Sequence, residues 1–198
     1  MVREAVGSHI PPSQLAALVL GAMGPTRHLV LVLDYDGTLV PIESRPHLAR
    51  ADTDLAQLLD RLAAHPRVWV AVVSGRGLDD LRDVLGTTGR LSLFAEHGGL
   101  VAWPDGTVAL LSGATEGEDL LRIRERLRRV SWPEGVWLEE KQLAVAVHTR
   151  GAPRPAASVA RELLQQVIKE MDPGQCLQVL EGKEVLEVRP QGLHKGLV

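Results

Sequence analysis

The chain has 198 residues, a formal net charge of -3 and a single cysteine, Cys176. This length can bury the core of one large or two small domains, and the charge balance gives no basis for nucleic-acid binding. One cysteine excludes an internal disulfide and is typical of a reducing compartment, no apolar run is long enough to span a membrane, and the first residues lack the apolar run of a signal peptide.

The first predicted element is a helix over residues 12–24. Ser13 is placed to cap its first turn, and Gly21 or Gly24 to end it. The apolar residues at helical spacing are Leu15, Leu18, Val19 and Ala22. We expect this helix to be a packing element.

Residues 31–39 carry the strongest functional pattern. An apolar run through Leu33 is typical of a strand buried on both faces of a parallel sheet, and ligands collect outside the carboxyl ends of such strands. Asp34 and Asp36 follow, and side chains two residues apart on an extended chain point the same way. Close carboxylates repel unless a cation or shared proton relieves them, and such oxygen ligands suit Mg²⁺. The alternative is an ordinary acidic turn.

Two more strands are predicted to end at polar residues. A helix capped by Asp52 or Thr53 precedes the strand Val68–Val73, which ends at Ser74, Gly75 and Arg76. The apolar stripe of that helix comprises Leu55, Leu58, Leu59 and Leu62. A helix over residues 78–85 then leads to the strand 91–95, followed by Glu96 and His97. Repeated strand, helix and strand with polar strand ends predicts a Rossmann-like α/β core with a parallel sheet.

The first motif resembles that of the haloacid dehalogenase-like (HAD) phosphohydrolases. It reads Asp34-Tyr35-Asp36-Gly37-Thr38-Leu39, and the next three residues, 40–42, resemble the trehalose-6-phosphate phosphatase branch. The resemblance implies an aspartyl-phosphate on Asp34, with Asp36 as the general acid and base, and Mg²⁺ held by these two residues. It also implies that Ser74 binds the phosphoryl group. The further substrate contacts that we expect in the core are Thr38, Gly75, Arg76, Glu96 and His97.

The pattern changes after Gly106. Residues 101–108 are typical of a hairpin, and Gly113 with Gly117 marks a hinge region. A basic helix follows, with Leu120, Ile123, Leu127 and Val130 inside and five arginines mostly outside. Those arginines form either a positive rim for anionic substrates or a solvated face paired from Glu118 to Arg122 and from Glu125 to Arg129; we favour the second.

A separate α+β unit is predicted next. Antiparallel strands over 136–148 precede a helix over 155–171 with Val159, Leu163, Val167 and Met171 on one face. Strands over 177–180 and 184–188 then flank a turn at residues 181–183. We therefore divide the chain into an N-terminal helical segment (1–26), a HAD core (27–109), an inserted α+β cap (110–188) and an incomplete return to the core (189–198).

The cap also resembles that of the same phosphatase branch. The resemblance implies sugar contacts at Lys141, His148, Arg150, Lys183 and Glu187. Charged side chains grip sugar hydroxyls specifically, and a closing cap excludes water. Lys183 and Glu187 are the preferred pair.

Lys195 matches the lysine of the third family motif, although His194 replaces the expected asparagine. A lysine offsets the charge of phosphate and carboxylates in such a site. The family continues into a strand and an acidic motif that completes the metal site, whereas this chain ends at Val198. We therefore expect a fragment with an exposed hydrophobic sheet edge.

The sequence thus predicts a cytoplasmic Mg²⁺-dependent phosphatase that hydrolyses trehalose 6-phosphate through an aspartyl-phosphate. Two alternatives stay open: a phosphatase of another sugar phosphate, or a noncatalytic HAD-like domain that binds a sugar phosphate or a partner. The expected partners are a small sugar phosphate and a trehalose-phosphate synthase, with neither nucleic acid nor membrane.

Overall fold

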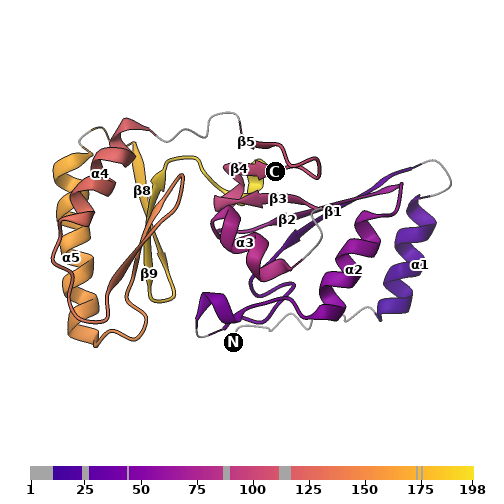
Figure 1. Ribbon diagram of the computed structural model, residues 1–198, viewed down its shortest axis with the longest axis horizontal. Helices are drawn as coiled ribbons and strands as arrows, with labels where there is room; N and C mark the ends of the chain where they lie inside the picture. Colours follow the sequence, from indigo (N-terminus) through magenta and orange to yellow (C-terminus); the bar gives the residue numbers. More distant parts are fainter. Residues whose placement is uncertain are drawn as a thin grey trace, which may run out of the picture.

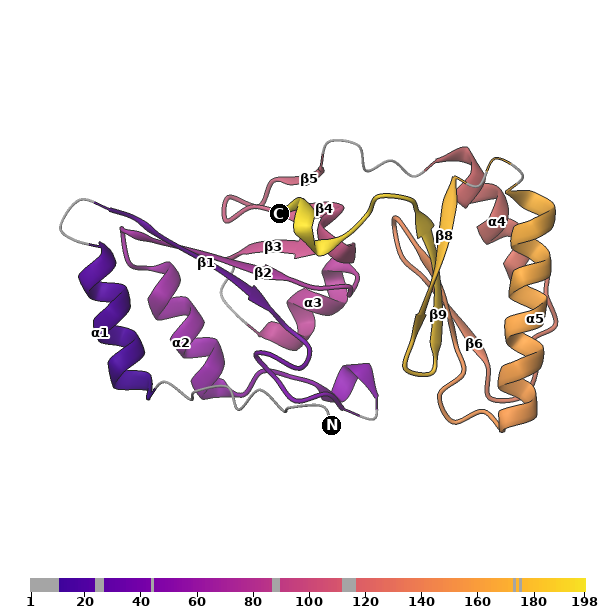
Figure 2. The ribbon, with the colours of Figure 1, turned by 180° about the vertical axis from the view of Figure 1, so that it is seen from behind.

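The computed structural model describes residues 11–23, 27–43, 45–86, 90–111, 117–172, 174 and 176–198. These residues form two parts that lie side by side, each built on its own β-sheet (Figures 1 and 2). In the described residues, no helix combines the length and apolar character that crossing a membrane requires.

The first part, the core, contains a five-stranded sheet in chain order. Its strands are β1 (Leu29–Asp34), β2 (Val68–Val73), β3 (Ser92–Ala95), β4 (Leu100–Ala102) and β5 (Val108–Leu110). The first three are parallel, and β4 and β5 continue the sheet as an antiparallel hairpin. This confirms the α/β fold with parallel central strands and the hairpin over residues 101–108.

Helices cover one face of the core sheet. The crossover helices α2 (Thr53–Ala63) and α3 (Leu78–Leu85) enclose a core that includes Leu59, Val72 and Leu81. The opposite face carries an aromatic cluster, in which the ring of Phe94 lies 6.3 Å from Trp69 and 5.9 Å from Trp103. Burial of this apolar surface is the main contribution to the stability of the core.

Strand β1 differs from expectation. Leu31 and Leu33 pack into the helical face, but Val30 is 55% exposed and Val32 is 51% exposed. The strand lies at the edge of the sheet and alternates between a packed face and an open face. The prediction that β1 is buried on both faces is therefore wrong, because an apolar run in the sequence does not show whether a second layer covers the strand. The exposed hydrophobic sheet edge is observed at this position.

The ends of the first two helices confirm one predicted cap and contradict another. Asp52 caps α2 by accepting a hydrogen bond of 2.8 Å from the Leu55 N–H, as predicted, although Leu58 is 44% exposed and lies outside the packed stripe. Helix α1 spans Pro12–Met23, so it begins before Ser13 and continues through Gly21. The predicted cap and the stop at Gly21 are wrong, because proline fits the first helical turn and an isolated glycine is tolerated in a helix. Gly24 lies outside the described residues.

The second part, the cap, is an antiparallel sheet in the order β6-β7-β9-β8 with two helices on one face (Figure 1). The strands are β6 (Trp137–Glu140), β7 (Val145–His148), β8 (Leu177–Gly182) and β9 (Val185–Pro190). The helices α4 (Glu118–Arg128) and α5 (Arg154–Met171) lie on the side away from the core. The other face of the sheet therefore turns toward the core. The predicted domain boundaries stay a prediction.

Three details of the cap depart from the sequence reading. On α5, Val159 is 44% exposed although Val167 of the same predicted stripe is buried, and the neighbouring residues Ala160 and Leu164 are buried as well. The β8–β9 turn falls at residues 183–184, because Gly182 pairs with Val185. Arg129 pairs with Glu125 as expected, but Arg122 lies nearest Asp119. Gly113 lies outside the described residues, and Gly117 caps α4.

Candidate active site

The predicted catalytic residues meet at one edge of the core sheet. Asp34 ends β1 and pairs in register with Val73, the last residue of β2. Ser74 follows immediately, and its N–H donates to the Phe94 carbonyl of β3 at 2.9 Å. The 3-10 turn Lys195–Leu197 returns to the same edge, where Lys195 Nζ lies 2.5 Å from Asp34 Oδ1. Ser74 Oγ also donates to Asp36 Oδ2 at 3.5 Å. Asp34, Asp36, Ser74 and Lys195, separated by up to 161 positions, thus share one end of the sheet.

Arg76 holds Asp36 in a two-pronged contact. Its Nε donates to Oδ2 at 2.9 Å, and its Nη2 donates to Oδ1 at 2.7 Å. The third nitrogen of the guanidinium, Nη1, donates to Asp80 Oδ2 at 2.7 Å. Arg76 is 8% exposed, and burial by itself lowers the pKa of its guanidinium, but the two carboxylates outweigh burial and raise the pKa above its usual range. Such a fork fixes the orientation of Asp36.

Tyr35 anchors the loop between the two aspartates. Because side chains alternate along the extended backbone, Tyr35 points into the core while its neighbours point to the edge. Its hydroxyl lies 2.9 Å from the Ala49 carbonyl and 3.0 Å from the Val84 carbonyl, and the Arg76 guanidinium stands 5.3 Å above its ring. Burial raises the pKa of the Tyr35 hydroxyl. This residue therefore positions the loop and supports Arg76.

Glu96 joins the core to the cap. Its side chain is 2% exposed, and its two carboxylate oxygens accept hydrogen bonds from the Gln142 N–H at 2.9 Å and the Leu143 N–H at 2.6 Å. Burial raises the pKa of Glu96, and these donors partly offset it. Glu96 and His97 both have positive φ values, 48° and 61°, which non-glycine residues rarely adopt. The backbone here is thus held in a conformation that it does not prefer.

A compact charged cluster spans the two parts. Lys141 Nζ donates to the Gly75 carbonyl at 3.0 Å and to Glu187 Oε2 at 2.5 Å, and His97 Nε2 lies 2.9 Å from Glu187 Oε1. Burial alone would raise the pKa of Glu187, but His97 and Lys141 lower it to about 2. A Cβ on Gly75 would lie 2.7 Å from His97 Cε1, so any larger residue there would displace the ring. We call these four residues the joint cluster.

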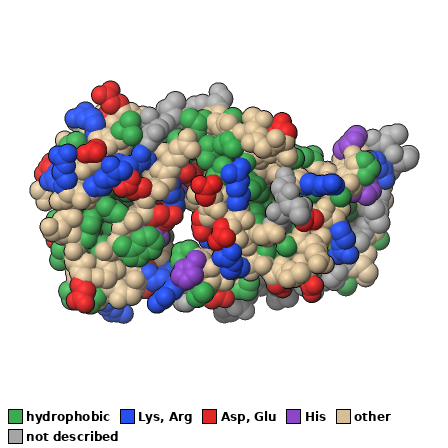
Figure 3. Space-filling view, in the orientation of Figure 1, with side chains coloured by type: hydrophobic (Ala, Val, Ile, Leu, Met, Phe, Trp, Pro, Cys, Tyr) green, Lys and Arg blue, Asp and Glu red, His purple; other side chains and the backbone are tan. Residues whose placement is uncertain are grey.

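A cavity of about 720 Å³ lies between the core and the cap. Its core wall includes Arg45, Pro46, His47 and Asp80, and its cap wall includes Trp137, Glu139, His148 and Arg150. Figure 3 shows the hollow between the two parts, with acidic, basic and histidine side chains around it. Arg76 touches this wall, since it donates to the Pro46 carbonyl at 2.8 Å. The cavity therefore adjoins the residue that holds Asp36.

The other predicted contacts occupy different positions. His148 Nε2 lies 2.7 Å from Glu139 Oε2, and burial alone would raise the pKa of Glu139, but His148 and Lys141 lower it. Arg150 joins the parts by donating to the Glu43 carbonyl at 3.1 Å. Thr38 is exposed within the first motif, and Lys183 is exposed in the β8–β9 turn. Direct sugar contact by these residues, and by Glu96, stays a prediction.

Three charged residues near this site are not among the predicted site residues. Asp80 pairs with Arg76, and the spacing of four residues along α3 was a usable signal. Glu139 pairs with His148 across neighbouring strands, which requires knowledge of the register. Arg189 is 6% exposed, and within the described residues its Nε and Nη1 have no hydrogen-bond partner, although Nη1 lies 3.7 Å from Glu187 Oε1.

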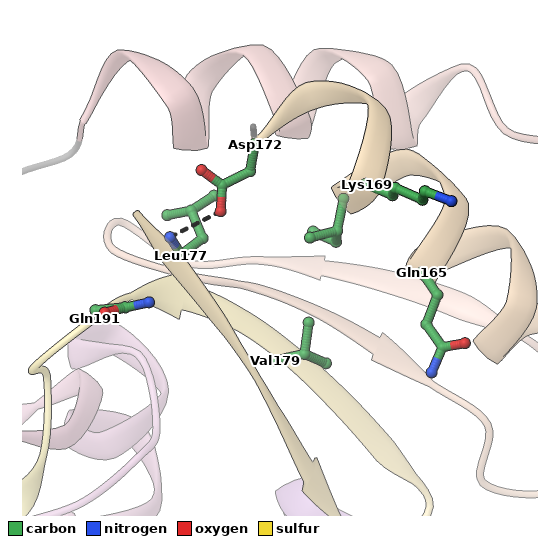
Figure 4. A pocket seen from close by; sticks show the side chains of 7 residues that line it. Gln165, Lys169, Asp172, Leu177, Val179 and Gln191 are labelled. Carbon is green, nitrogen blue, oxygen red and sulfur yellow. Dashed lines mark hydrogen bonds between the residues drawn. The ribbon is translucent and has the colours of Figure 1, made fainter. Parts of the chain in front are cut away.

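A second cavity, on the outside of the cap, lacks comparable chemistry. It lies between α5 and the strand β8, and it is lined by Gln165, Lys169, Leu177 and Val179 among others (Figure 4). Asp172 is also at its edge, but that carboxylate accepts hydrogen bonds of 2.9 Å from the N–H groups of Cys176 and Leu177. Asp172 therefore closes the turn after α5, and the cleft between core and cap is the candidate active site.

The strand-end oxygens fit a hard cation that keeps several waters. Asp34 Oδ1 accepts hydrogen bonds from Lys195 and from the Tyr35 N–H, and both carboxylate oxygens of Asp36 accept from Arg76. Asp34 Oδ2 and the Asp36 carbonyl oxygen are the atoms best placed to act as metal ligands. In the described part of the chain, no third His, Cys, Asp or Glu forms a metal-binding group with these two. Mg²⁺ tolerates such a site because water and substrate phosphate fill its other positions.

Comparison with known sequences identifies relatives over most of the chain. The trehalose-phosphatase family model matches residues 32–198. The bifunctional trehalose-6-phosphate synthase/phosphatase of Thermoproteus tenax is 39% identical over 176 residues, which covers 84% of this chain and 23% of that protein. The trehalose-phosphatase of Schizosaccharomyces pombe is 34% identical over 176 residues, covering 84% of this chain and 21% of its own length. The chain thus spans less than a quarter of these relatives.

Solved structures share the fold. The C-terminal domain of Candida albicans trehalose-6-phosphate phosphatase superposes with a TM-score of 0.72 and 24% identity, over 91% of this chain and 63% of that one. A trehalose-6-phosphate phosphatase related protein gives a TM-score of 0.69 and 26% identity, over 84% of this chain and 70% of that one.

Proposed function

The chain belongs to the trehalose-phosphatase family, and on this premise we propose that it hydrolyses trehalose 6-phosphate to trehalose and inorganic phosphate. The observation that carries the proposal is the gathering of Asp34, Asp36, Ser74 and Lys195 at one sheet edge, beside a polar cleft. A binding module has no need of a nucleophile in this position. The substrate is proposed from the names of the relatives.

In the first proposed step, an Asp34 carboxylate oxygen attacks phosphorus. The Asp36 carboxylate takes up a proton from solvent when the substrate binds, and it gives this proton to the sugar oxygen as the bond between that oxygen and phosphorus breaks. In the second step Asp36 takes a proton from water, the water oxygen attacks phosphorus, and the aspartyl-phosphate bond breaks to release phosphate. Ser74 and Lys195 hold the phosphoryl oxygens and offset their charge. Arg76 supports this assignment because it orients Asp36.

We propose Mg²⁺ as the cofactor, held by Asp34 and the Asp36 carbonyl. The charge balance of the site supports this proposal. Lys195 already offsets Asp34, and Arg76 already offsets Asp36, so these four groups carry no net charge before a substrate binds. A phosphate monoester would add two negative charges at neutral pH. A divalent ion supplies the opposite charge and polarises the phosphoryl group.

The proposed partner is a trehalose-phosphate synthase. The Thermoproteus tenax relative is named as a bifunctional synthase/phosphatase, so the two activities occur there in one chain. We propose the cytoplasm as the compartment, because a single cysteine is typical of a reducing environment.

The test is phosphate release from trehalose 6-phosphate, glucose 6-phosphate and sucrose 6-phosphate, with Mg²⁺ or with EDTA. We expect Mg²⁺-dependent turnover that favours trehalose 6-phosphate and that falls about a thousandfold or more in Asp34→Asn, because this change removes the nucleophile. Asp54→Asn, at an exposed position in the first turn of α2, is the matched control and should keep wild-type turnover.

A folded chain that releases no phosphate from any of these substrates would overturn the enzymatic proposal. Calorimetric titration with trehalose 6-phosphate would then decide the alternative, since a noncatalytic sugar-phosphate domain still binds it. Turnover of another sugar phosphate at a higher kcat/KM would leave the chemistry intact and replace the substrate.

A further inference from the structure

Trp137 and His148 form a flat aromatic stack on the cap. Trp137 begins β6 and His148 ends β7, and the two residues are paired directly in the antiparallel register. Their rings lie 3.8 Å apart with an interplanar angle of 6°. His148 is also held by Glu139, 2.7 Å from its Nε2. The imidazole is therefore fixed on both sides and supports one face of the indole.

The indole is exposed although one of its faces is covered. Trp137 is 46% exposed, and it lines the cavity of about 720 Å³ between the core and the cap. The alternation of β6 sends Leu138 into the apolar interior of the cap and Trp137 to the opposite face. Trp137 therefore does not contribute to the packed interior of the cap, so packing does not explain a tryptophan at this position.

The surroundings of the indole define the class of ligand. Arg45, His47 and Asp80 stand across the cavity, and Arg150 lies on the same wall as Trp137. A ligand must then offer one apolar face to the ring and polar groups at its rim. A pyranose meets both conditions, because its axial C–H groups form an apolar face while its hydroxyls project sideways.

We propose that Trp137 is a specificity-determining residue that stacks against the sugar ring that does not carry the phosphate. This inference rests on the proposed function and extends it, because it assigns the discrimination between disaccharide and monosaccharide phosphates to one side chain. The phosphate-bearing ring lies nearer the strand ends, so the second ring occupies the part of the cavity in front of the cap. Arg150 and Glu139 are placed to contact its hydroxyls.

The test compares dissociation constants for trehalose 6-phosphate, glucose 6-phosphate and inorganic phosphate by calorimetry. Trp137→Ala and Trp137→Leu should each weaken trehalose 6-phosphate binding about five- to tenfold, which is the usual scale for loss of an aromatic contact. Trp137→Phe should stay within about threefold of wild type, because it keeps a flat ring. Binding of glucose 6-phosphate and phosphate should not change. In turnover, the alanine variant should raise KM for trehalose 6-phosphate and leave kcat unchanged.

Leu121→Ala is the matched control, because Leu121 is 44% exposed and lies on α4, on the face of the cap away from the core. It should bind all three ligands as wild type does, and circular dichroism should show that every variant is folded. Wild-type affinity for trehalose 6-phosphate in both Trp137→Ala and Trp137→Leu overturns the proposal. Equal weakening of all three ligands also overturns it, because it indicates that Trp137 only supports the site.

Failure of the proposed function is a different result. If the wild-type chain binds trehalose 6-phosphate but releases no phosphate, the catalytic proposal fails and the comparison of dissociation constants still decides the role of Trp137. If the wild-type chain binds trehalose 6-phosphate no more tightly than glucose 6-phosphate, the second ring has no site and the inference is wrong.

Discussion

Substitution of Glu187 by glutamine tests the joint cluster most directly. The change keeps the shape of the side chain and removes its charge. The Glu187 side chain is 10% exposed, as is that of Lys141, and the two lie 2.5 Å apart. The variant leaves the Lys141 ammonium buried without its carboxylate partner in the joint cluster. Loss of one partner of a buried ion pair typically costs about 3–5 kcal/mol.

The pKa of Glu187 gives the same scale and the pH dependence. Its fall from 4.5 to about 2 on folding corresponds to roughly 3 kcal/mol. A carboxyl group whose pKa is lower in the folded state stabilises the fold above its unfolded pKa. That stabilisation is lost as the pH falls through the folded value. The difference between wild type and variant should therefore be about 3 kcal/mol at pH 7 and should shrink between pH 4.5 and pH 2.

Urea unfolding followed by circular dichroism, at several pH values, measures this difference. Glu162→Gln, at an exposed position on α5, is the matched control and should change stability by less than about 0.5 kcal/mol. A Glu187→Gln variant that unfolds within that margin of wild type at pH 7 would refute the reasoning. A large difference that persists unchanged into acid would also refute it, because the charge of Glu187 could not then be the cause.

Two further changes test the supports of the site. In Gly75→Ala, the new Cβ would lie 2.7 Å from His97 Cε1, so the ring must move away from Glu187; we expect a loss of about 1–3 kcal/mol in thermal unfolding. Gly77→Ala is the control: its new Cβ meets no atom within 4 Å, so it should lower the free energy of unfolding by less than about 1 kcal/mol. Equal losses of stability in the two variants would contradict the close approach of His97 to Gly75. In Tyr35→Phe, the buried carbonyls of Ala49 and Val84 lose the hydroxyl that donates to them. Urea unfolding should show that the free energy of unfolding falls by about 1–2 kcal/mol. An unchanged midpoint would show that water replaces the hydroxyl.

The sequence predicted those features that depend on neighbours along the chain. The strand Val68–Val73 was predicted with its observed bounds, because a compact apolar run ends abruptly at Ser74. Asp52 is one of the two caps that the sequence predicts for α2, the other being Thr53, because a capping side chain needs only the N–H groups up to three residues ahead. Parallel pairing then brings Asp34 and Ser74 together, since the carboxyl ends of neighbouring parallel strands share one edge.

Features that depend on a second layer were not predictable in the same way. On α5 the predicted stripe runs through Val159 and Val167, but only its C-terminal part packs in the cap core, where Val167 is buried. Ala160 and Leu164, which lie beside that stripe, are buried because the cap sheet covers them. Val30 and Val32 look like core residues in the sequence, yet their exposure depends on whether another element covers that face of β1. Trp137 was missed because its stacking on His148 follows from the register of β6 and β7.

The hydrogen bonds that join core and cap each pair a charged side chain with a main-chain group. The sequence predicts the charged residues, but it gives no signal for the residues whose main-chain groups they contact. Glu96 accepts from main-chain N–H groups of the cap, and Lys141 and Arg150 donate to main-chain carbonyls of the core. Every residue supplies a carbonyl, and every residue except proline supplies an N–H. The side chains at the receiving positions 43 and 142 can therefore vary without loss of these hydrogen bonds. Gly75 is the exception, because the approach of His97 restricts its side chain as well. The position of the cap over the strand ends thus depends on a few charged side chains and one glycine, and these are the residues whose substitution should alter substrate binding without removing any of the four proposed catalytic groups.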